Sequence, residues 1–328
     1  MENYYVLSAR QVKNGDFTSE PGAARYLKVP WGQLPSPACE CSAATWVSEV
    51  RDFADGQMDS RIEEGGNILF FVHGYNNDLQ AVADRTRWLQ EDLSAAGWNG
   101  IVAAFDWPSA DSTLNYLEDR QDAAATALRL VDAGIRVLAR GQAKGCKTNI
   151  HLLGHSTGAF VIAKAFELAN NDGELFTDKS WGVAQVAFIS GDVSAEGWET
   201  GPIFDRIDRL TNYQNGYDYV LAVSNAKRFG TSPRAGRIGM VAGANRLVVN
   251  VDCSEYFNTL DPAQQPRKTG TWCHSWQIGN PVWTLDLAMT LEGRVDRNYL
   301  PTRKLVNNRL VLQPGTRPAY EAAWLENG

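Results

Sequence analysis

The apolar residues of this chain fall into short continuous runs that alternate with longer segments of helical spacing. The central runs, at 67–73, 101–106 and 148–153, are apolar at nearly every position. Strands buried on both faces have this pattern, whereas strands with one solvent-exposed face alternate between apolar and polar residues. Weaker runs of the same kind predict further strands at 4–9, 25–29, 183–190, 219–224 and 246–252.

Between these runs, apolar residues recur every three to four positions, which is the spacing of a helix with one buried face. Helices are predicted at 78–97, 115–141, 158–170, 202–212 and 281–293, and Asp78 is predicted to be the N-cap of the first. Strands that alternate with helices along a chain favour a parallel sheet. The predicted fold class is therefore α/β, a mostly parallel central sheet with helices on both faces and a small lid or none.

Prolines mark two segments outside this alternation. Segment 30–48 contains three prolines and is predicted to be a surface loop. Segment 294–328 is predicted to be a C-terminal extension with a hairpin near 305–312. We see no firm boundary elsewhere, so residues 1–328 are predicted to form a single α/β domain.

Composition and charge exclude several classes of partner. The net charge is −7 without a Lys/Arg cluster, so neither nucleic acid nor an anionic membrane is indicated. No apolar run is long enough for an integral membrane segment, and the first residues do not resemble a signal peptide. Five scattered cysteines suit a reducing cytoplasm, the expected location. Cys39 and Cys41 have no second pair beside them, so no metal site is expected.

The segment Gly154–Gly158 matches the pattern G-x-S-x-G and places Ser156 at its centre. It follows the strand at 148–153 and precedes the helix at 158–170, which is the strand–turn–helix context of a nucleophile elbow in an α/β-hydrolase. Side chains at Gly154 or Gly158 would collide with the flanking strand or helix. A chance match in a loop would lack this context, so Ser156 is predicted to be a catalytic nucleophile.

An oxyanion hole is predicted from the strand that ends in His73 and Gly74. Gly74 permits a sharp turn close to the nucleophile. The backbone N–H groups of Tyr75 and Thr157 are the predicted donors. His73 is predicted to bond within its own loop, and a general-base role for it is the alternative.

The general base is predicted by elimination among four histidines. His151 lies inside a strand, and His155 is adjacent to the serine and cannot turn back onto it. His274 is the only histidine downstream of Ser156, as the chain order serine, acid, histidine requires. His274 is therefore the predicted base.

The third member of a catalytic triad is an acid, and no single motif marks it in this sequence. Its commonest position in this fold follows the seventh strand, assigned here to 219–224, yet no Asp or Glu occurs from 224 to 245 and Asn225 is the only polar candidate at that strand end. Asp192, at the end of the preceding strand, is the predicted acid. Asp252, close to His274 in sequence, is the second candidate, and a helix cap or salt bridge is the alternative role for Asp192.

Ordered blocks across residues 3–293 together resemble a bacterial α/β-hydrolase family of largely unassigned function. The blocks are Phe71–Asn77, Phe105–Ser109, Tyr116 with the helix 119–143, Gly154–Gly158, Gly191–Val193, Val251–Ser254 and His274–Trp276. The resemblance implies Ser156, His274 and Asp192 as the triad, and it supplies no substrate. One departure is that the family carries Ser-Asn-x-Asp after the seventh strand, where this chain has Ser224-Asn225-Ala226-Lys227.

The predicted function is a serine hydrolase that cleaves a small-molecule carboxylic ester through an acyl-enzyme, without a cofactor. Trp107 and Trp276 are predicted either to line an acyl pocket or to pack in the core. Two alternatives stay open: a catalytically silent hydrolase-fold binding module, which the absent carboxylate favours, and a thioesterase or acyltransferase with the same triad. The oligomeric state is not predicted.

Overall fold

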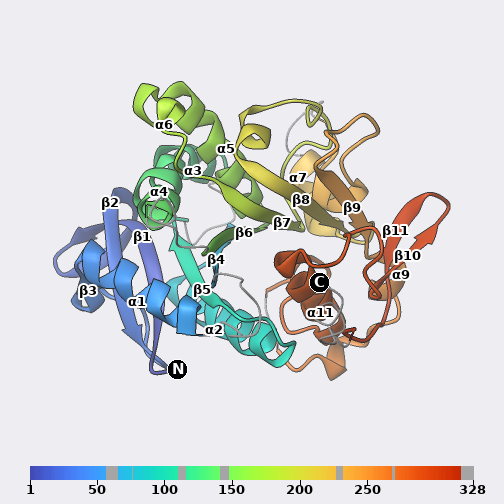
Figure 1. The fold of residues 1–328 in the computed structure, drawn as a ribbon, viewed down its shortest axis with the longest axis horizontal. Helices are drawn as coiled ribbons and strands as arrows, with labels where there is room; N and C mark the ends of the chain where they lie inside the picture. Colours follow the sequence, from blue (N-terminus) through green and yellow to red (C-terminus); the bar gives the residue numbers. More distant parts are fainter. Residues whose placement is uncertain are drawn as a thin grey trace, which may run out of the picture.

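The computed structural model describes residues 1–56, 66–75, 77–109, 116–140, 148–226, 232–267 and 270–318. Within these ranges, one sheet of 11 strands runs through the molecule in the order β10-β11-β9-β8-β7-β6-β4-β5-β1-β2-β3 (Figure 1). The strands are β1 (Asn3–Lys13), β2 (Asp16–Pro30), β3 (Glu40–Cys41), β4 (Asn67–Val72), β5 (Ile101–Asp106), β6 (Asn149–His155), β7 (Val183–Ile189), β8 (Ile207–Gln214), β9 (Val248–Asp252), β10 (Arg303–Val306) and β11 (Arg309–Leu312).

The centre of this sheet is parallel and its two ends are antiparallel. Every pairing from β1 through β5, β4, β6, β7, β8 and β9 to β11 is parallel. β2 and β3 are added antiparallel at one end, and β10 at the other. The carboxyl ends of the central strands therefore meet at one edge of the sheet, which is where ligands bind in open α/β folds.

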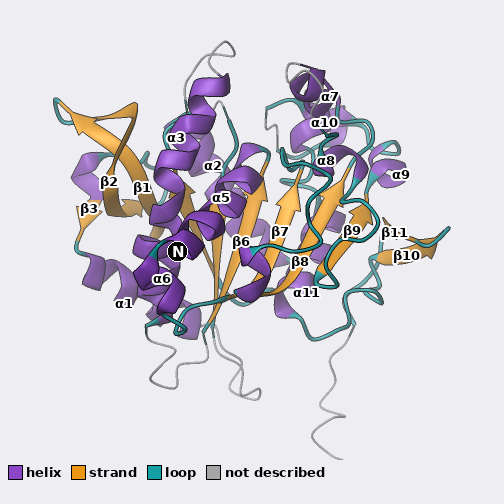
Figure 2. Cartoon of the chain, turned by 90° about the horizontal axis from the view of Figure 1, so that it is seen from above, coloured by secondary structure: helices purple, strands orange, loops and turns teal. Residues whose placement is uncertain are grey.

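Helices cover both faces of the sheet (Figure 2). They are α1 (Ala43–Gly56), α2 (Leu79–Ala95), α3 (Tyr116–Arg129), the π-helical η2 (Leu130–Ile135), α4 (Arg136–Ala139), α5 (Thr157–Asn171), α6 (Gly173–Thr177), α7 (Tyr219–Ala226), α8 (Ala235–Ile238), α9 (Ser254–Phe257), α10 (Trp272–Ser275) and α11 (Pro281–Glu292), with 3-10 turns η1 (Pro37–Cys39), η4 (Pro202–Asp205) and η5 (Pro262–Gln264). In the part of the chain that the structure describes, none of them has the length and apolar character needed to cross a membrane.

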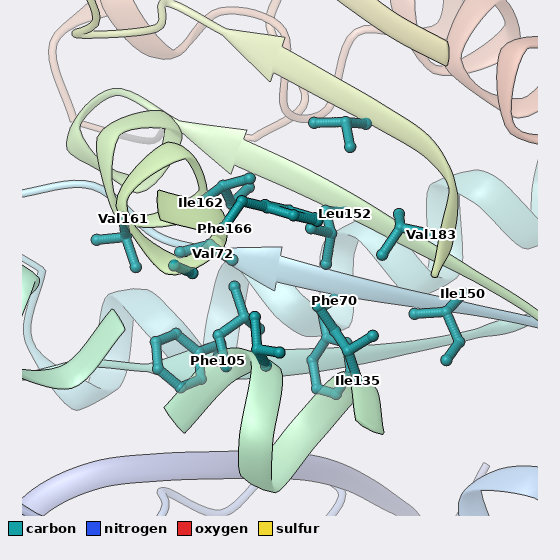
Figure 3. Packing of buried hydrophobic residues seen from close by; sticks show 14 of the residues in the cluster. Phe70, Val72, Phe105, Ile135, Ile150, Leu152, Val161, Ile162, Phe166 and Val183 are labelled. Carbon is teal, nitrogen blue, oxygen red and sulfur yellow. The ribbon is translucent and has the colours of Figure 1, made fainter. Parts of the chain in front are cut away.

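Alternate side chains of the central strands enter two separate cores. In β4, Phe70 and Val72 pack with α1, α3 and α5 on one face, whereas Leu69 and Phe71 pack with α2 and α11 on the other. Figure 3 shows the first of these cores, with Val72 close to side chains of α5 and Phe70 beside Ile135 of η2. Burial on both faces explains why the sequences of the central strands are continuous apolar runs. The predicted fold class, a mostly parallel sheet with helices on both faces, is confirmed.

Most predicted elements occur, but two were assigned to the wrong class. The predicted helix at 202–212 is the turn η4 followed by strand β8, and the predicted strand at 219–224 is helix α7. Asp78 is the N-cap of α2, as predicted, and accepts a hydrogen bond from the Ala81 N–H. Segment 30–48, predicted to be a surface loop, holds η1, β3 and the start of α1.

The C-terminal segment is held by strand pairing with the sheet and by a buried ion pair with α11. The predicted hairpin is β10 and β11, and β11 pairs with β9. At the start of β10, the Arg303 guanidinium contacts the Asp286 carboxylate of α11 at 2.5 Å, and both side chains are fully buried. Asp286 also accepts hydrogen bonds from Tyr213 and Thr302, both at 2.6 Å. Residues 319–328 of this predicted extension lie outside the described residues.

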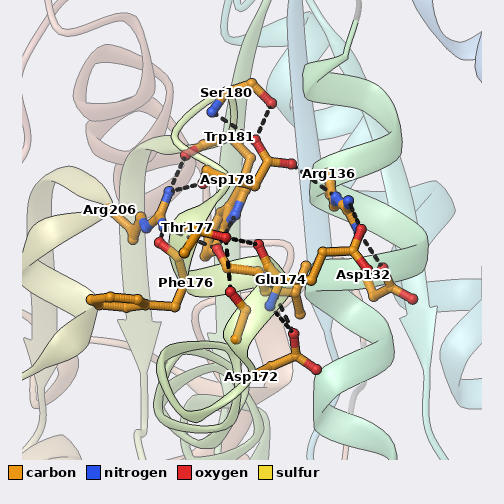
Figure 4. A network of polar contacts seen from close by, with 12 residues as sticks. Asp132, Arg136, Asp172, Glu174, Phe176, Thr177, Asp178, Ser180, Trp181 and Arg206 are labelled. Atoms are coloured by element: carbon orange, nitrogen blue, oxygen red, sulfur yellow. Dashed lines mark hydrogen bonds and ion pairs between the residues drawn. The ribbon is translucent and has the colours of Figure 1, made fainter.

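A second polar network joins elements at the amino ends of the strands (Figure 4). Arg136 of α4 contacts Asp132, Asp178 and Glu174, and so ties α4 to α6. Arg206, just before β8, donates to main-chain carbonyls around α6. This network is remote from the carboxyl edge and serves to hold α4, α6 and β8 together.

Candidate active site

Ser156 stands in a strained turn between β6 and α5. Its backbone has φ 55° and ψ −121°, a region that residues other than glycine rarely adopt. A Cβ added at Gly158 would lie 2.0 Å from the carbonyl oxygen of Val72, and one added at Gly154 would lie 2.8 Å from Cα of Ala159. Both glycines are therefore sterically required, as the sequence pattern predicts for a nucleophile elbow.

His274 of α10 reaches this serine from a segment far along the chain. Its Nε2 lies 2.8 Å from Oγ of Ser156, within hydrogen-bond distance. Ser156 is 8% and His274 7% exposed. A nucleophile and a base that are hydrogen-bonded and shielded from most of the solvent are the arrangement that activates a serine hydroxyl.

The carboxylate on the other side of the imidazole belongs to Asp218. Its Oδ2 lies 2.7 Å from Nδ1 of His274, and its Oδ1 accepts a hydrogen bond from the Leu221 N–H at 3.1 Å. Asp218 is fully buried at the start of α7. One carboxylate thus caps this helix and also holds the imidazole with its proton on Nδ1, which leaves Nε2 free to accept the serine proton.

Asp192 does not occupy this position, so the prediction that its carboxylate bonds to His274 was wrong. Oδ1 of Asp192 lies 3.2 Å from Nε of Arg234, in an ion pair whose two side chains are almost completely buried. Its main-chain N–H donates to the Ser156 carbonyl, so the residue is close to Ser156 through its backbone. Asp252, the second candidate, pairs with Arg309.

The error came from the strand assignment and not from the positional rule. Because 219–224 is helical, the last strand before this segment is β8, which ends at Gln214. Asp218 follows β8 directly and lies in the position that the chain order serine, acid, histidine requires. The side chain of Asn225, considered as a substitute for a carboxylate, lies outside the described residues.

The loop after β4 lies directly against Ser156. A Cβ added at Gly74 would be 2.8 Å from Cβ of Ser156. Asn77 donates from Nδ2 to the carbonyls of Gly74, at 2.7 Å, and Tyr75, at 3.0 Å. Its own carbonyl accepts hydrogen bonds from Arg10 and Ser109. The loop is therefore held in close contact with Ser156.

His73 holds this loop and does not face the serine. Its Nδ1 donates to the Gly74 carbonyl at 2.8 Å, and its Nε2 lies 3.3 Å from the main-chain nitrogen of Trp107. Asp106 lies 3.3 Å from the same Nε2. Burial alone would raise the pKa of Asp106, but Arg10, His73 and Ser8 lower it to about 2. His73 thus belongs to a buried charged cluster, in the structural role that the sequence predicts.

Both tryptophans proposed for the acyl pocket are buried in contact with other side chains. Trp107 and Trp276 are 0% and 1% exposed. The indole N–H of Trp107 donates to the His73 carbonyl at 2.8 Å, and its ring stacks on the His73 imidazole. Trp276 packs against Tyr256 and Phe257. Of the two roles predicted for them, both side chains have the packing role.

No group of three or more His, Cys, Asp and Glu side chains in the described ranges is arranged to hold a metal ion. Asp218 after β8, His274 in α10 and Ser156 after β6 instead form a row of hydrogen bonds that joins two strand ends and a short helix. This row can carry a proton from the serine hydroxyl to the imidazole.

Comparison with known proteins places the chain in a family. No curated protein matches it. A novel cutinase-like protein from Cryptococcus sp. is 15% identical to it, over 72% of this chain and 96% of that chain, with a TM-score of 0.36. Phospholipase PlaB from Legionella pneumophila in complex with thio-NAD is 12% identical, over 75% of this chain and 67% of that chain, with a TM-score of 0.35. The putative cell surface hydrolase from Lactobacillus plantarum WCFS1 is 12% identical, over 71% of this chain and 92% of that chain, with a TM-score of 0.36.

The sequence identities and TM-scores of these three structures are too low to support any conclusion about this chain. The match to a family model is stronger, because it spans residues 53–259, from the end of α1 past β9, and so includes Ser156 and Asp218. That family is described as alpha/beta hydrolase of unknown function (DUF900), which agrees with the fold and with the family resemblance seen in the sequence. The chain belongs to this DUF900 family of α/β-hydrolases.

Proposed function

We propose that the protein is a serine hydrolase that cleaves carboxylic esters with Ser156, His274 and Asp218 as its catalytic triad. One observation carries the proposal: Asp218 Oδ2, the His274 imidazole and Ser156 Oγ are joined by contacts of 2.7 Å and 2.8 Å. In this order of groups, a carboxylate orients an imidazole that acts as general base toward a hydroxyl.

The proposed reaction begins with attack of Ser156 Oγ on the ester carbonyl. His274 Nε2 takes the hydroxyl proton and returns it to the departing alcohol, which leaves an acyl-enzyme on Ser156. Water then repeats the sequence in the second half, releasing the acid and restoring the serine. The Asp218 carboxylate stabilises the imidazolium that forms in each half.

The oxyanion is proposed to bind the backbone N–H groups of Tyr75 and Thr157. Thr157 is the first residue of α5, where N–H groups have no partner within the helix. The partial positive charge of the helix N-terminus favours a developing negative charge at the same place. The close approach of Gly74 to Ser156 supports a contribution from the adjacent Tyr75 N–H.

The silent binding module loses its main support. The sequence favoured it because no carboxylate followed the assigned seventh strand, and Asp218 supplies that carboxylate after β8. Thioester cleavage and acyl transfer would use the same three residues, so the nature of the acyl donor and acceptor has to come from a substrate panel.

The test is hydrolysis of p-nitrophenyl esters of rising acyl length by the wild type and by Ser156→Ala. The variant should lose at least about 10,000-fold in kcat/KM because no other group replaces the nucleophile. It should also lose labelling by a fluorophosphonate probe. Ser48→Ala, at a serine of α1 whose hydroxyl donates to Asp52, is the matched control and should retain both activities. Near-normal turnover by Ser156→Ala would overturn the proposal.

A further inference from the structure

The side chain of His155 contacts the catalytic histidine from the residue next to the nucleophile. Its Nε2 lies 3.0 Å from the main-chain carbonyl oxygen of His274. We propose that His155 is a positioning residue, which fixes the His274 imidazole over Ser156 by donating a hydrogen bond to that carbonyl. This inference rests on the proposed function, since it concerns the same triad.

Two bonds then join the elbow to His274 at neighbouring points. Ser156 Oγ meets the imidazole at 2.8 Å, and His155 Nε2 meets the backbone of the same residue at 3.0 Å. Because successive residues of the elbow make the two contacts, a movement of α10 away from β6 would stretch both at once. The pair therefore fixes the distance from base to nucleophile, on which proton transfer depends steeply.

The His274 segment depends on such side-chain contacts. Helix α10 has only four residues, so it makes few backbone hydrogen bonds of its own. Asn215 donates to the Cys273 carbonyl at 3.1 Å, and Gln265 donates to the Trp276 carbonyl at 2.7 Å. His155 supplies the corresponding bond at the His274 carbonyl. Of these three side-chain donors, His155 is the one that lies in the same turn as Ser156.

Arg85 selects the tautomer of His155 that can make this bond. Nη1 of Arg85 lies 3.5 Å from Nδ1 of His155. A guanidinium can only donate, so Nδ1 must accept and the ring proton must be on Nε2. Burial lowers the pKa of His155 well below its ordinary value, and the charges of Arg85 and His274 lower it further.

A neutral His155 also suits the reaction. The two imidazole rings are 5.1 Å apart, so a positive charge on His155 would oppose the imidazolium that forms on His274. A neutral ring donates to the His274 carbonyl without adding that repulsion. His155 is thus suited to hold the base in both of its charge states.

The test compares His155→Gln with His155→Asn. The longer Gln side chain can place its amide N–H near the position of the imidazole Nε2, whereas Asn reaches only the position of Nδ1. With a p-nitrophenyl ester, we expect His155→Asn to lower kcat by about 10- to 100-fold with KM within about 2-fold of wild type, and His155→Gln to recover most of the loss.

His151→Asn is the matched control. His151 lies in the same strand, is equally buried and bonds to Asn67 Oδ1 at 3.0 Å, away from the catalytic residues. This variant should lower the unfolding temperature and leave kcat unchanged. If His151→Asn lowers kcat as much as His155→Asn does, the loss comes from replacing any buried histidine of this strand and not from the bond to His274. That result would overturn the inference.

The remaining outcomes separate this inference from the proposed function. Wild-type kcat in a folded His155→Asn, or equal losses in the Gln and Asn variants, would overturn the positioning role and leave Ser156-dependent hydrolysis intact. Near-normal turnover by Ser156→Ala would instead overturn the proposed function. If His155→Asn does not fold, a folded His155→Gln with wild-type kcat supports the role, and one with the 10- to 100-fold loss contradicts it.

Discussion

Asp218 and Asp192 are two buried aspartates at neighbouring strand ends, and their partners give them different roles. Asp218 follows β8 and contacts Nδ1 of His274 at 2.7 Å. Asp192 follows β7 and contacts Nε of Arg234 at 3.2 Å. The two side chains have the same charge and are 0% and 2% exposed. Sequence position and burial therefore do not distinguish a catalytic acid from a structural one.

The partner of each carboxylate distinguishes the two, because only a carboxylate without a permanent positive partner can stabilise a positive charge that forms during the reaction. Asp192 faces a guanidinium that is always positive, so its charge is already compensated. Asp218 faces an imidazole, whose charge appears only when the serine proton is transferred. Substitutions at each aspartate test this difference, and two further carboxylates at strand ends, Asp106 and Asp252, extend the comparison.

The largest effect is expected for Asp218→Asn. An amide can donate to Nδ1 and so stabilise the tautomer with its proton on Nε2, which cannot accept the serine proton. We expect kcat/KM for p-nitrophenyl esters to fall roughly 1,000- to 10,000-fold, with the fold kept because Asn can still accept from the Leu221 N–H. A loss below about 10-fold would contradict the assigned role.

Asp192→Asn should affect stability more than activity. The ion pair with Arg234 is almost fully buried, and removal of one charge from such a pair costs about 3 kcal/mol or more in the free energy of unfolding. The backbone bond from Asp192 to Ser156 does not involve the side chain, so kcat/KM should fall by less than about 10-fold. Urea unfolding and ester kinetics measure the two effects separately.

Asp106, at the end of β5, should give a stability effect that depends on pH. Its pKa is lowered from 3.8 to about 2 in the folded protein, against the opposing effect of burial, by Arg10, His73 and Ser8. Its contribution, roughly 2 kcal/mol, is then fully present above about pH 4 and is lost as the pH falls toward about 2.

The measurement for Asp106 compares urea unfolding of the wild type and Asp106→Asn between about pH 6 and pH 3. The gap in unfolding free energy should be constant above about pH 5 and narrow by about 1.4 kcal/mol per pH unit below about pH 4. A gap that stays constant down to about pH 3 would mean that this carboxyl group has an ordinary pKa in the folded state.

The smallest effect is expected for Asp252→Asn. Its partner Arg309 has a side chain that is 58% exposed, and such exposed pairs contribute about 0–1 kcal/mol. Its Oδ1 also accepts from the Ser254 N–H, which an asparagine oxygen can equally do. Neither the free energy of unfolding nor kcat/KM should change measurably, and a large loss of activity would return Asp252 to the list of candidate acids.

Strong local patterns allowed much of the site to be predicted from sequence. Ser156 stands between a continuous apolar strand and a helix, and both flanking glycines prove to be sterically required. His274 was found by elimination, since His151 and His155 are fixed by the strand and the elbow. Both predictions rest on the order of elements, which the sequence shows clearly at this point.

The acid could not be predicted because apolar character misassigned two elements. Residues 219–226 are mostly apolar, as a buried strand would be, yet they form α7. Residues 207–214 contain several polar side chains but form β8, where Asn212 is buried and donates to the Ala235 carbonyl and to Asn250. Long-range hydrogen bonds of this kind satisfy polar groups inside a sheet and leave no local pattern in the sequence.

The rate at which a fluorophosphonate modifies Ser156, followed by intact mass in the wild type, Asp218→Asn and Asp192→Asn, tests the central claim most directly. The account predicts that the wild type is modified at Ser156, that Asp192→Asn reacts within about 10-fold of that rate, and that Asp218→Asn reacts at least about 100-fold more slowly. Modification that is slow in Asp192→Asn and rapid in Asp218→Asn would contradict the assignment of the acid. Absence of modification at Ser156 in the wild type would contradict the triad as a whole.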